Sequence, residues 1–202
     1  MTKVEVQQLH EFYRKYLLED IVPFWASRTE DDEFGGYFHH FDRQGQLGCR
    51  DKNMWVQGRQ LQFFSDLYLQ LEKRPQWLTL ARSGRDFIVE HGYAGDGRWF
   101  YLLNQNGIVK DSHLSFPTDA FILAGLSAYA IASESDQDKK LIETTYDCFE
   151  KNFYDKSFNE HYHFSLDPYY KWHGTHMITL YVSILVEPVL GSARTKPLVD
   201  YW

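Results

Sequence analysis

Cysteine and long hydrophobic runs are scarce in this sequence, and each shortage excludes a class of protein. Cys49 and Cys148 are the only cysteines among 202 residues, and their spacing does not suggest a disulfide framework. No apolar run reaches the roughly 18 residues that a membrane-spanning helix needs. The N-terminal residues also lack the hydrophobic core of a signal peptide. We therefore expect reduced thiols, no membrane partner and a cytoplasmic location.

Basic charge and nucleotide-binding motifs are lacking too. Lys and Arg number 21 against 28 Asp and Glu, which gives a net charge of −7 without a basic block or stripe. This balance argues against a nucleic-acid partner, which requires a basic surface. The sequence contains no Gly-x-Gly-x-x-Gly, no Walker loop and no Gly-x-Ser-x-Gly. We expect no cofactor and no serine hydrolase chemistry.

Aromatic residues, in contrast, are abundant: 15 Phe, 14 Tyr and 6 Trp make up 17% of the chain. Their large apolar surface is suited to core packing, and Tyr and Trp also carry a polar tip. This combination is suited to a cleft that binds carbohydrate.

Apolar residues recur at helical spacing in six segments, which predicts an all-α fold. Pro75 is typical of a first helical position and Ser115 of a helix cap. We expect three helical hairpins stacked side by side in one domain, 1–202, with a divergent tail over 191–202. The expected helices cover about 4–25, 52–71, 75–88, 115–132, 136–152 and 175–190.

Two glycine-rich segments with alternating aromatic residues separate these helices, at 33–47 and 93–108, and 153–164 is a weaker third copy that lacks the glycines. Their similarity predicts a repeated β-hairpin in the helix-connecting loops. In the first segment, His39 and His40 are adjacent, so both cannot point to the same face of a strand.

The second helix raises a question, because Trp55, Arg59 and Phe63 follow one another at a spacing of four and share a face. Removing a guanidinium from water costs several kcal/mol unless it is paired. Arg59 therefore either lies on the rim with Trp55 covering its stem, or lines a polar ligand cavity with Trp55. Gln57 belongs to the same helix start and is a further candidate.

Two histidines, His173 and His176, lie at the start of the sixth helix and are candidates for proton transfer near neutral pH. A rim or core position is the alternative for both. Together with His161 and His163 they could form a metal site, but no cysteine accompanies them and Glu160 is the only carboxylate at ligand spacing. We therefore expect no metal.

Several motifs together resemble one family. They are Pro23-Phe-Trp, Asp31-Asp-Glu-Phe-Gly-Gly-Tyr-Phe38, Asp42-Arg-Gln-Gly45 and, most specific, Asp51-Lys-Asn-Met-Trp-Val-Gln-Gly-Arg59. From about residue 16 to 190 the chain resembles the N-acylglucosamine 2-epimerase family, whose relatives include cellobiose 2-epimerases and the mannose and sulfoquinovose isomerases. The resemblance implies an (α/α)6 barrel, a toroid of helical hairpins, of which this chain would be the first half.

The resemblance also assigns roles. Arg59 would bind the sugar oxygens at the reacting carbons and Trp55 would pack on the sugar, with Gln57, Asp119 and His176 as further substrate contacts. His176 would join Arg59 as a catalytic residue, although this chain reads His-Met where several relatives read Met-His. Where some relatives have a tyrosine before the fourth helix, this chain has Phe116 and Pro117.

The implied function is a sugar 2-epimerase or aldose–ketose isomerase that removes the C2 proton and forms a cis-enediolate. The partner would be a mono- or disaccharide. The family's two proton-transfer histidines belong to the second half of the barrel, so a catalytically silent sugar-binding or scaffold half-barrel is the alternative. A glycoside hydrolase would need two facing carboxylates, a role in which Asp119 or Glu160 could serve only by coincidence. An open barrel edge also predicts self-association through the first and sixth helices.

Overall fold

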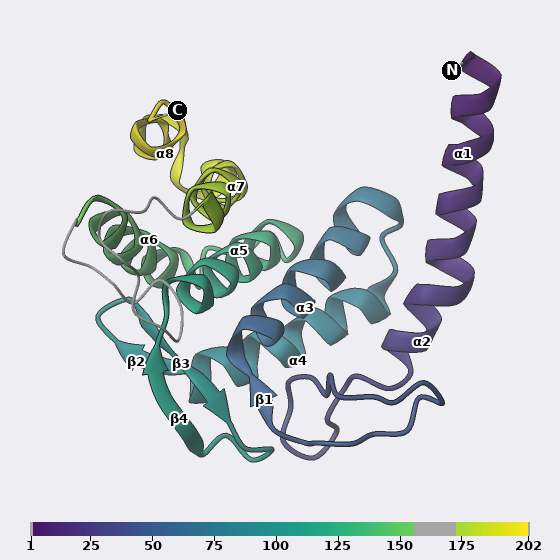
Figure 1. Cartoon of the computed structure of the whole chain (residues 1–202), viewed down its shortest axis with the longest axis horizontal. Coiled ribbons are helices and arrows are strands. Elements are labelled where there is room, and N and C mark those ends of the chain that lie inside the picture. Colours follow the sequence, from purple (N-terminus) through teal and green to yellow (C-terminus); the bar gives the residue numbers. More distant parts are fainter. Residues whose placement is uncertain (1, 156–172, 202) are drawn as a thin grey trace.

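The chain folds into an arc of paired helices with a small sheet at one end (Figure 1). The structure is a computed structural model that describes residues 2–155 and 173–201. Two π-helical segments, Leu17–Ile21 and Leu67–Leu71, continue the helices before them. The helices are α1 (Lys3–Tyr16), α2 (Val22–Ala26), α3 (Met54–Asp66), α4 (Pro75–His91), α5 (Phe116–Ala132), α6 (Lys139–Tyr154), α7 (His173–Leu190) and α8 (Ser192–Val199).

The predicted helices are confirmed within a few residues at each end, and so are two of the start signals. Pro75 occupies the first turn of α4, and the Ser115 side chain accepts a hydrogen bond from the Thr118 N–H at the start of α5. The described part of the tail, which we expected to diverge from the family, forms α8 against α7. Arg194 of α8 pairs with Asp147 and Glu150 of α6, each at 2.7 Å.

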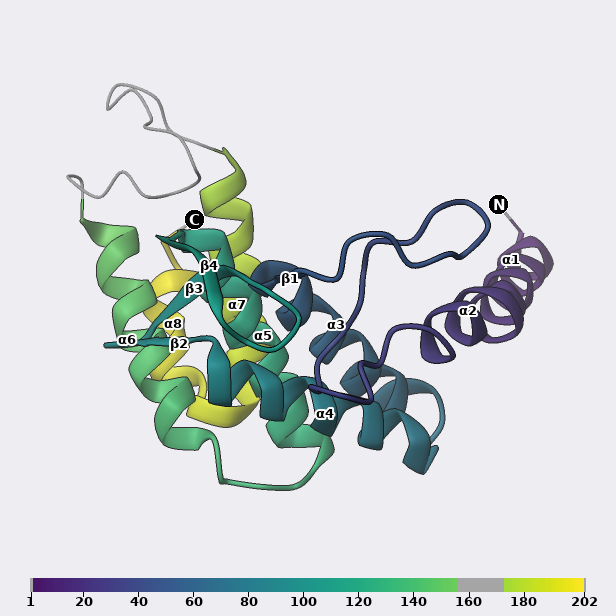
Figure 2. The same cartoon turned by 90° about the horizontal axis from the view of Figure 1, so that it is seen from below.

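The helices form two layers, as Figures 1 and 2 show from two sides. An inner layer consists of α3, α5 and α7 side by side, and an outer layer consists of α4, α6 and α8, which pack behind them in the same order. Helix α5 is the centre of the core, because every one of its residues except Ile131 is buried. The stacked helical hairpins predicted from the sequence are confirmed.

The sheet connects α3 to the region between α4 and α5. Strand β3 (Arg98–Leu103) pairs antiparallel with β1 (Lys52–Asn53), β2 (Tyr93–Gly95) and β4 (Val109–Leu114). The second predicted hairpin is therefore confirmed. The first forms only in part, because residues 33–47 contain no regular strand: an antiparallel bridge joins Phe41 to Leu47, and another joins Tyr37 to Glu30. The third lies almost entirely outside the described residues.

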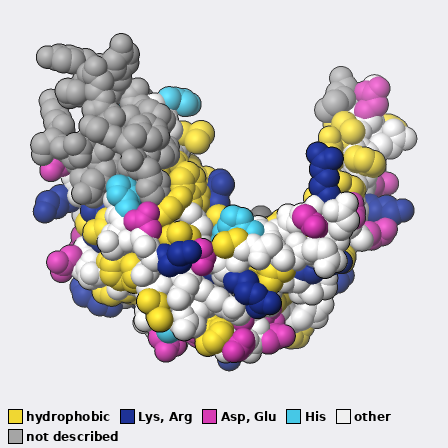
Figure 3. Space-filling view, turned by 60° about the horizontal axis from the view of Figure 1, so that its bottom comes forward, with side chains coloured by type: hydrophobic (Ala, Val, Ile, Leu, Met, Phe, Trp, Pro, Cys, Tyr) yellow, Lys and Arg dark blue, Asp and Glu magenta, His cyan; other side chains and the backbone are white. Residues whose placement is uncertain are grey.

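The N-terminal helix packs least against the rest of the chain. The side chains of its apolar stripe, Leu9, Phe12, Tyr13 and Tyr16, are 42% to 63% exposed. A salt bridge of 3.1 Å from Arg14 to Glu72 links α1 to the end of α3. Figure 3 shows that a hollow separates the arm that carries α1 from the rest of the molecule. None of the helices in the described ranges combines the length and apolar content that crossing a bilayer requires.

Candidate functional site

One stripe of α3 faces away from the outer layer and carries the residues of interest. Trp55, Arg59, Gln62 and Asp66 follow at intervals of four, three and four residues, which places them on one side of the helix. Gln57, half a turn away from Trp55, is fully buried on the opposite side. We call the surface formed by this stripe and the exposed stripe of α7 the inner face.

Arg59 lies on this inner face with its guanidinium exposed but held in place. Its Cζ lies 4.3 Å from the centroid of the Phe121 ring of α5, a cation–π contact. The Trp55 ring stacks on the same Phe121, with centroids 5.1 Å apart and planes 15° apart. Among the described residues, no carboxylate pairs with Arg59, so its N–H donors are available to a ligand. Arg59 therefore lies on the rim, as the first alternative expected, and its N–H donors are accessible to a ligand, as the second alternative requires.

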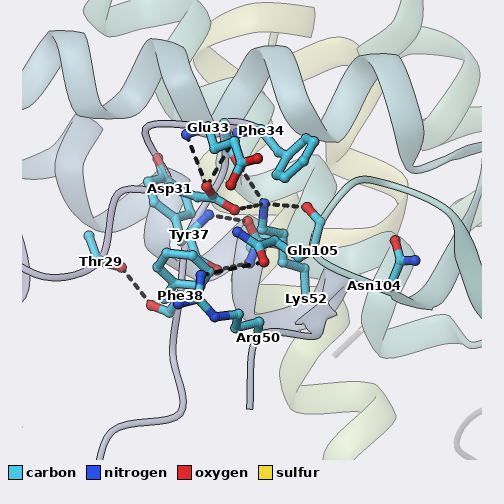
Figure 4. A network of polar contacts seen from close by, with 12 residues as sticks. Thr29, Asp31, Glu33, Phe34, Tyr37, Phe38, Arg50, Lys52, Asn104 and Gln105 are labelled. Carbon is cyan, nitrogen blue, oxygen red and sulfur yellow. Dashed lines mark hydrogen bonds and ion pairs between the residues drawn. The ribbon is translucent and has the colours of Figure 1, made fainter. Parts of the chain in front are cut away.

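Lys52 organises the loops at the start of α3 (Figure 4). Its ammonium group is fully buried and donates to Asp31 Oδ2 at 2.8 Å, the Gly35 carbonyl at 2.5 Å and the Gln105 carbonyl at 2.8 Å. It also lies 4.1 Å from the centroid of the Phe87 ring. Burial lowers the pKa of Lys52, and the ion pair with Asp31 opposes that shift. Lys52 thus joins three segments that are distant in sequence.

Gln57 also has a structural position. Its Oε1 accepts from the Tyr37 N–H at 2.8 Å and its Nε2 donates to the Tyr37 carbonyl at 2.7 Å. A fully buried amide with both ends bonded to backbone has no polar atom directed at the inner face. The geometry therefore does not support the substrate contact expected of Gln57. The Asp-Lys-x-x-Trp-x-Gln-x-Arg motif divides into loop-holding residues and inner-face residues.

Asp119 is likewise engaged within the fold. Its carboxylate accepts from Arg98 Nε at 2.6 Å and from the Trp99 N–H at 3.0 Å, and the side chain is almost fully buried. This arrangement fixes β3 to the first turn of α5, where a carboxylate is also favoured by the helix dipole. The expected sugar contact at Asp119 is not supported by this geometry.

His176 is not brought together with Arg59. Its ring contacts Phe153 of α6 edge-on, with centroids 5.7 Å apart. The α7 residues on the inner face are Met177, Tyr181 and Ile184, and Met177 is 57% exposed. Adjacent helical residues differ by about 100° in direction, so the His-Met order places methionine on this face and turns the histidine toward α6.

Three further histidines were candidates for proton transfer or metal binding. His173 is exposed at the start of α7, whereas His161 and His163 lie outside the described residues. Within the described ranges, no group of three or more His, Cys, Asp or Glu side chains could hold a metal ion.

A polar bridge crosses the inner face about one turn from Arg59, and none of its residues was among the candidates predicted from the sequence. The Tyr181 hydroxyl of α7 donates to Gln62 Oε1 at 2.8 Å, and Gln62 Nε2 donates to Asp66 Oδ2 at 3.1 Å. Burial raises the pKa of Asp66, which the hydrogen bond from Gln62 partly offsets. Extending the Trp55–Arg59 stripe by helical spacing would have found Gln62, but only the folded chain reveals Tyr181 and Phe121.

Two hollows lie elsewhere and are lined by other residues. One of about 570 Å³ lies between α2 and α4, and one of about 480 Å³ lies beside α6. Neither includes Trp55, Arg59 or a residue of α7. As far as the described residues show, Trp55 and Arg59 lie on an open surface, and we take this inner face as the candidate site because of their arrangement on Phe121.

Comparison with known sequences points to one family. A family model described as N-acylglucosamine 2-epimerase (GlcNAc 2-epimerase) matches residues 36–194. The N-acylglucosamine 2-epimerase of Mus musculus is 33% identical over 131 residues, which cover 62% of this chain and 31% of that protein. The protein of the same name from Bos taurus is 37% identical over 76 residues, which cover 37% of this chain and 18% of that protein.

Solved structures agree with this in fold. The cellobiose 2-epimerase of Spirochaeta thermophila superimposes with a TM-score of 0.84 at 20% identity, covering 98% of this chain and 53% of that chain. A D-mannose isomerase superimposes with a TM-score of 0.75 at 18% identity, covering 93% of this chain and 49% of that one. The chain thus spans about half the length of these relatives, and its expected fold, the first half of an (α/α)6 barrel, is confirmed.

Proposed function

The chain belongs to the N-acylglucosamine 2-epimerase family, and from this we propose that it binds a mono- or disaccharide on its inner face, as part of a sugar 2-epimerase or aldose–ketose isomerase. The observation that carries the proposal is the arrangement of Arg59 and Trp55 around Phe121. A flat aromatic ring beside an exposed, oriented guanidinium matches the two surfaces of a sugar, its C–H face and its oxygens.

The chemistry of the proposed reaction requires a fixed cation. Removal of the proton at C2 of an open-chain aldose transfers negative charge to the carbonyl oxygen and gives a cis-enediolate. Arg59 would stabilise that charge with N–H donors that are already oriented by Phe121. Return of the proton to C2 gives the epimer, whereas return to C1 gives the ketose.

A second candidate is a sugar-binding half-barrel without catalysis. The observation in its favour is that α7 presents Met177 to the inner face, while His176 contacts Phe153. A thioether cannot take up a proton from carbon at neutral pH. In this alternative, Arg59 and Trp55 bind sugar but no proton leaves C2.

Calorimetry with N-acetylmannosamine, mannose and cellobiose tests the shared part of both candidates. The Arg59→Ala variant should lose most of its sugar affinity, because the charge-assisted donors are gone. Arg82→Ala is the matched control, since Arg82 is an exposed arginine of α4 in the outer layer. Equal affinity in the Arg59→Ala variant and the wild type would overturn the proposed site.

Proton exchange then separates the two candidates. The wild-type chain is incubated with each sugar in deuterated water, and deuterium at C2 is measured by NMR. Incorporation that depends on Arg59 supports the epimerase or isomerase. Binding without incorporation supports the silent half-barrel.

A further inference from the structure

The bridge from Tyr181 through Gln62 to Asp66 is placed where a ligand bound to Arg59 would meet it. Gln62 follows Arg59 by three residues on the same stripe, which is about 4.5 Å farther along the helix axis. Tyr181 reaches Gln62 from α7, across the top of the buried helix α5. The bridge therefore crosses the inner face about one helical turn from Arg59.

The orientation of the Gln62 amide is fixed by its two partners. Oε1 accepts from the Tyr181 hydroxyl and Nε2 donates to the Asp66 carboxylate, so the oxygen end faces α7. An amide that is already oriented loses little conformational freedom when it binds a ligand. This is the arrangement expected of a side chain that contacts a ligand through defined donors and acceptors.

The bridge also keeps hydrogen-bonding capacity that the described residues do not use. Gln62 has a second N–H and a second lone pair on Oε1, and the Tyr181 oxygen can still accept. Tyr181 is 41% exposed on the inner face, so a ligand bound there can reach these groups. A cross-brace made only for stability would gain little from a hydrogen bond that remains open to water.

We propose that Gln62 and Tyr181 form a second sugar-contacting subsite, in which they hydrogen-bond ring hydroxyls of the saccharide held by Arg59 and Trp55. The inference rests on the proposed function, because it concerns the same ligand. It assigns the reacting carbons to Arg59 and the recognition of hydroxyls farther along the sugar to the bridge. Asp66 is a positioning residue, since it acts through the Gln62 amide.

The Tyr181→Phe variant tests this subsite with minimal change in packing. It should weaken binding of mannose or N-acetylmannosamine by about fivefold to tenfold, the effect of one hydrogen bond. Its thermal midpoint should stay close to that of the wild type. The matched control is Tyr154→Phe, which removes another tyrosine hydroxyl bond, to the Pro197 carbonyl at 3.2 Å, far from the inner face.

A double-mutant cycle with monodeoxy mannoses identifies the hydroxyl concerned. If Tyr181 or Gln62 contacts that hydroxyl, its removal weakens binding to the wild type but has little further effect on the Tyr181→Phe or Gln62→Ala variant. Additive losses for every deoxy sugar would overturn the contact, and so would unchanged affinity in both variants.

The Arg59→Ala variant distinguishes failure of this inference from failure of the proposed function. Loss of binding in Arg59→Ala with full affinity in Tyr181→Phe and Gln62→Ala would leave the sugar site standing and reject the second subsite. No measurable binding by the wild type would reject both.

Discussion

Gly58 of α3 and Gly125 of α5 meet where the two helices cross, so that a Cβ added to Gly125 would collide with the Gly58 carbonyl oxygen. A Cβ added to Gly58 would in turn meet the Phe121 carbonyl at 2.5 Å. Because neither residue has a side chain, the two backbones touch. This close crossing brings Trp55 of α3 onto the Phe121 ring of α5, and therefore sets the geometry of the inner face.

Replacing Gly125 should destabilise the chain although alanine is the better helix former. The collision is with backbone, which cannot rotate away, so we expect Gly125→Ala to lower the free energy of unfolding by about 3 kcal/mol. Urea denaturation measures the change. The control is Ser127→Ala in the same helix, which removes a buried hydroxyl without a partner among the described residues and should be nearly neutral. Equal stability of Gly125→Ala and wild type would show that the helices can separate without loss.

Replacing Lys52 should lower the stability of the fold much more than replacing a lysine at the surface. Lys52→Met leaves the Asp31 carboxylate buried without its cation and two carbonyls without a donor. Breaking a buried pair in this way costs about 3–5 kcal/mol. Lys110→Met is the control, because Lys110 pairs with Asp51 at the surface and should change stability little. Similar urea midpoints for the two variants would contradict this role of Lys52.

Acid should destabilise the fold through His39. Burial, and secondarily the neighbouring His40, lowers the pKa of His39 from 6.5 to about 4, and neither ring nitrogen has a partner among the described residues. The unfolded chain therefore binds the proton more tightly. Stability is fully present above pH 6.5 and falls as the pH drops from 6.5 to about 4, by about 3 kcal/mol at most.

The His39→Leu variant isolates this contribution. Its free energy of unfolding should lack the part of the pH dependence that His39 adds to the wild type between pH 7 and 4.5. The measurement is a urea titration of both proteins across this range. A difference between wild type and variant that stays constant with pH would rule out the assigned shift.

The exposed stripe of α1 should drive self-association. Phe12 and Tyr16 are 62% and 50% exposed on a helix that buries none of its residues, and burial of apolar surface is favourable by about 25 cal/mol per Å². We expect the wild type to associate in sedimentation at low micromolar concentration, and a Phe12→Ser, Tyr16→Ser variant to remain monomeric. Ile108→Ser, at an exposed hairpin position, is the control. A monomeric wild type would contradict this expectation.

Helix positions could be predicted from the sequence because their signals are local. Ser115 caps α5 and Pro75 starts α4 through contacts within a single turn. The segment 33–47 forms less of a hairpin than its alternating residues predicted, because the contacts that hold it are not local. Gly35 and Gly36 have positive φ, and the Tyr37 backbone bonds to the Gln57 side chain instead of a neighbouring strand. That partner lies 20 residues away, so alternation alone could not reveal it.

The candidate site shows the same limit. Spacing placed Trp55 and Arg59 on one face, and the structure agrees. Spacing could not tell that Gln57 and Asp119 are bonded within the fold, since Tyr37, Arg98 and Trp99 are their partners only after folding. For His176, a shift of one residue decides between the inner face and α6, and the sequence does not fix the rotation of α7.

The buried ammonium of Lys52 also has a kinetic consequence. Its three partners lie 21, 17 and 53 residues away in sequence, and the group loses its water only when all three surround it. If only some of these partners were in place, the Lys52 ammonium group would lose water without gaining all of its hydrogen bonds. We therefore expect the cluster to form late in folding, after the rate-limiting barrier. Lys52→Met should therefore accelerate unfolding several hundredfold or more and leave the folding rate nearly unchanged in stopped-flow chevron measurements. On this account, Lys52 determines how long the native state persists before it unfolds.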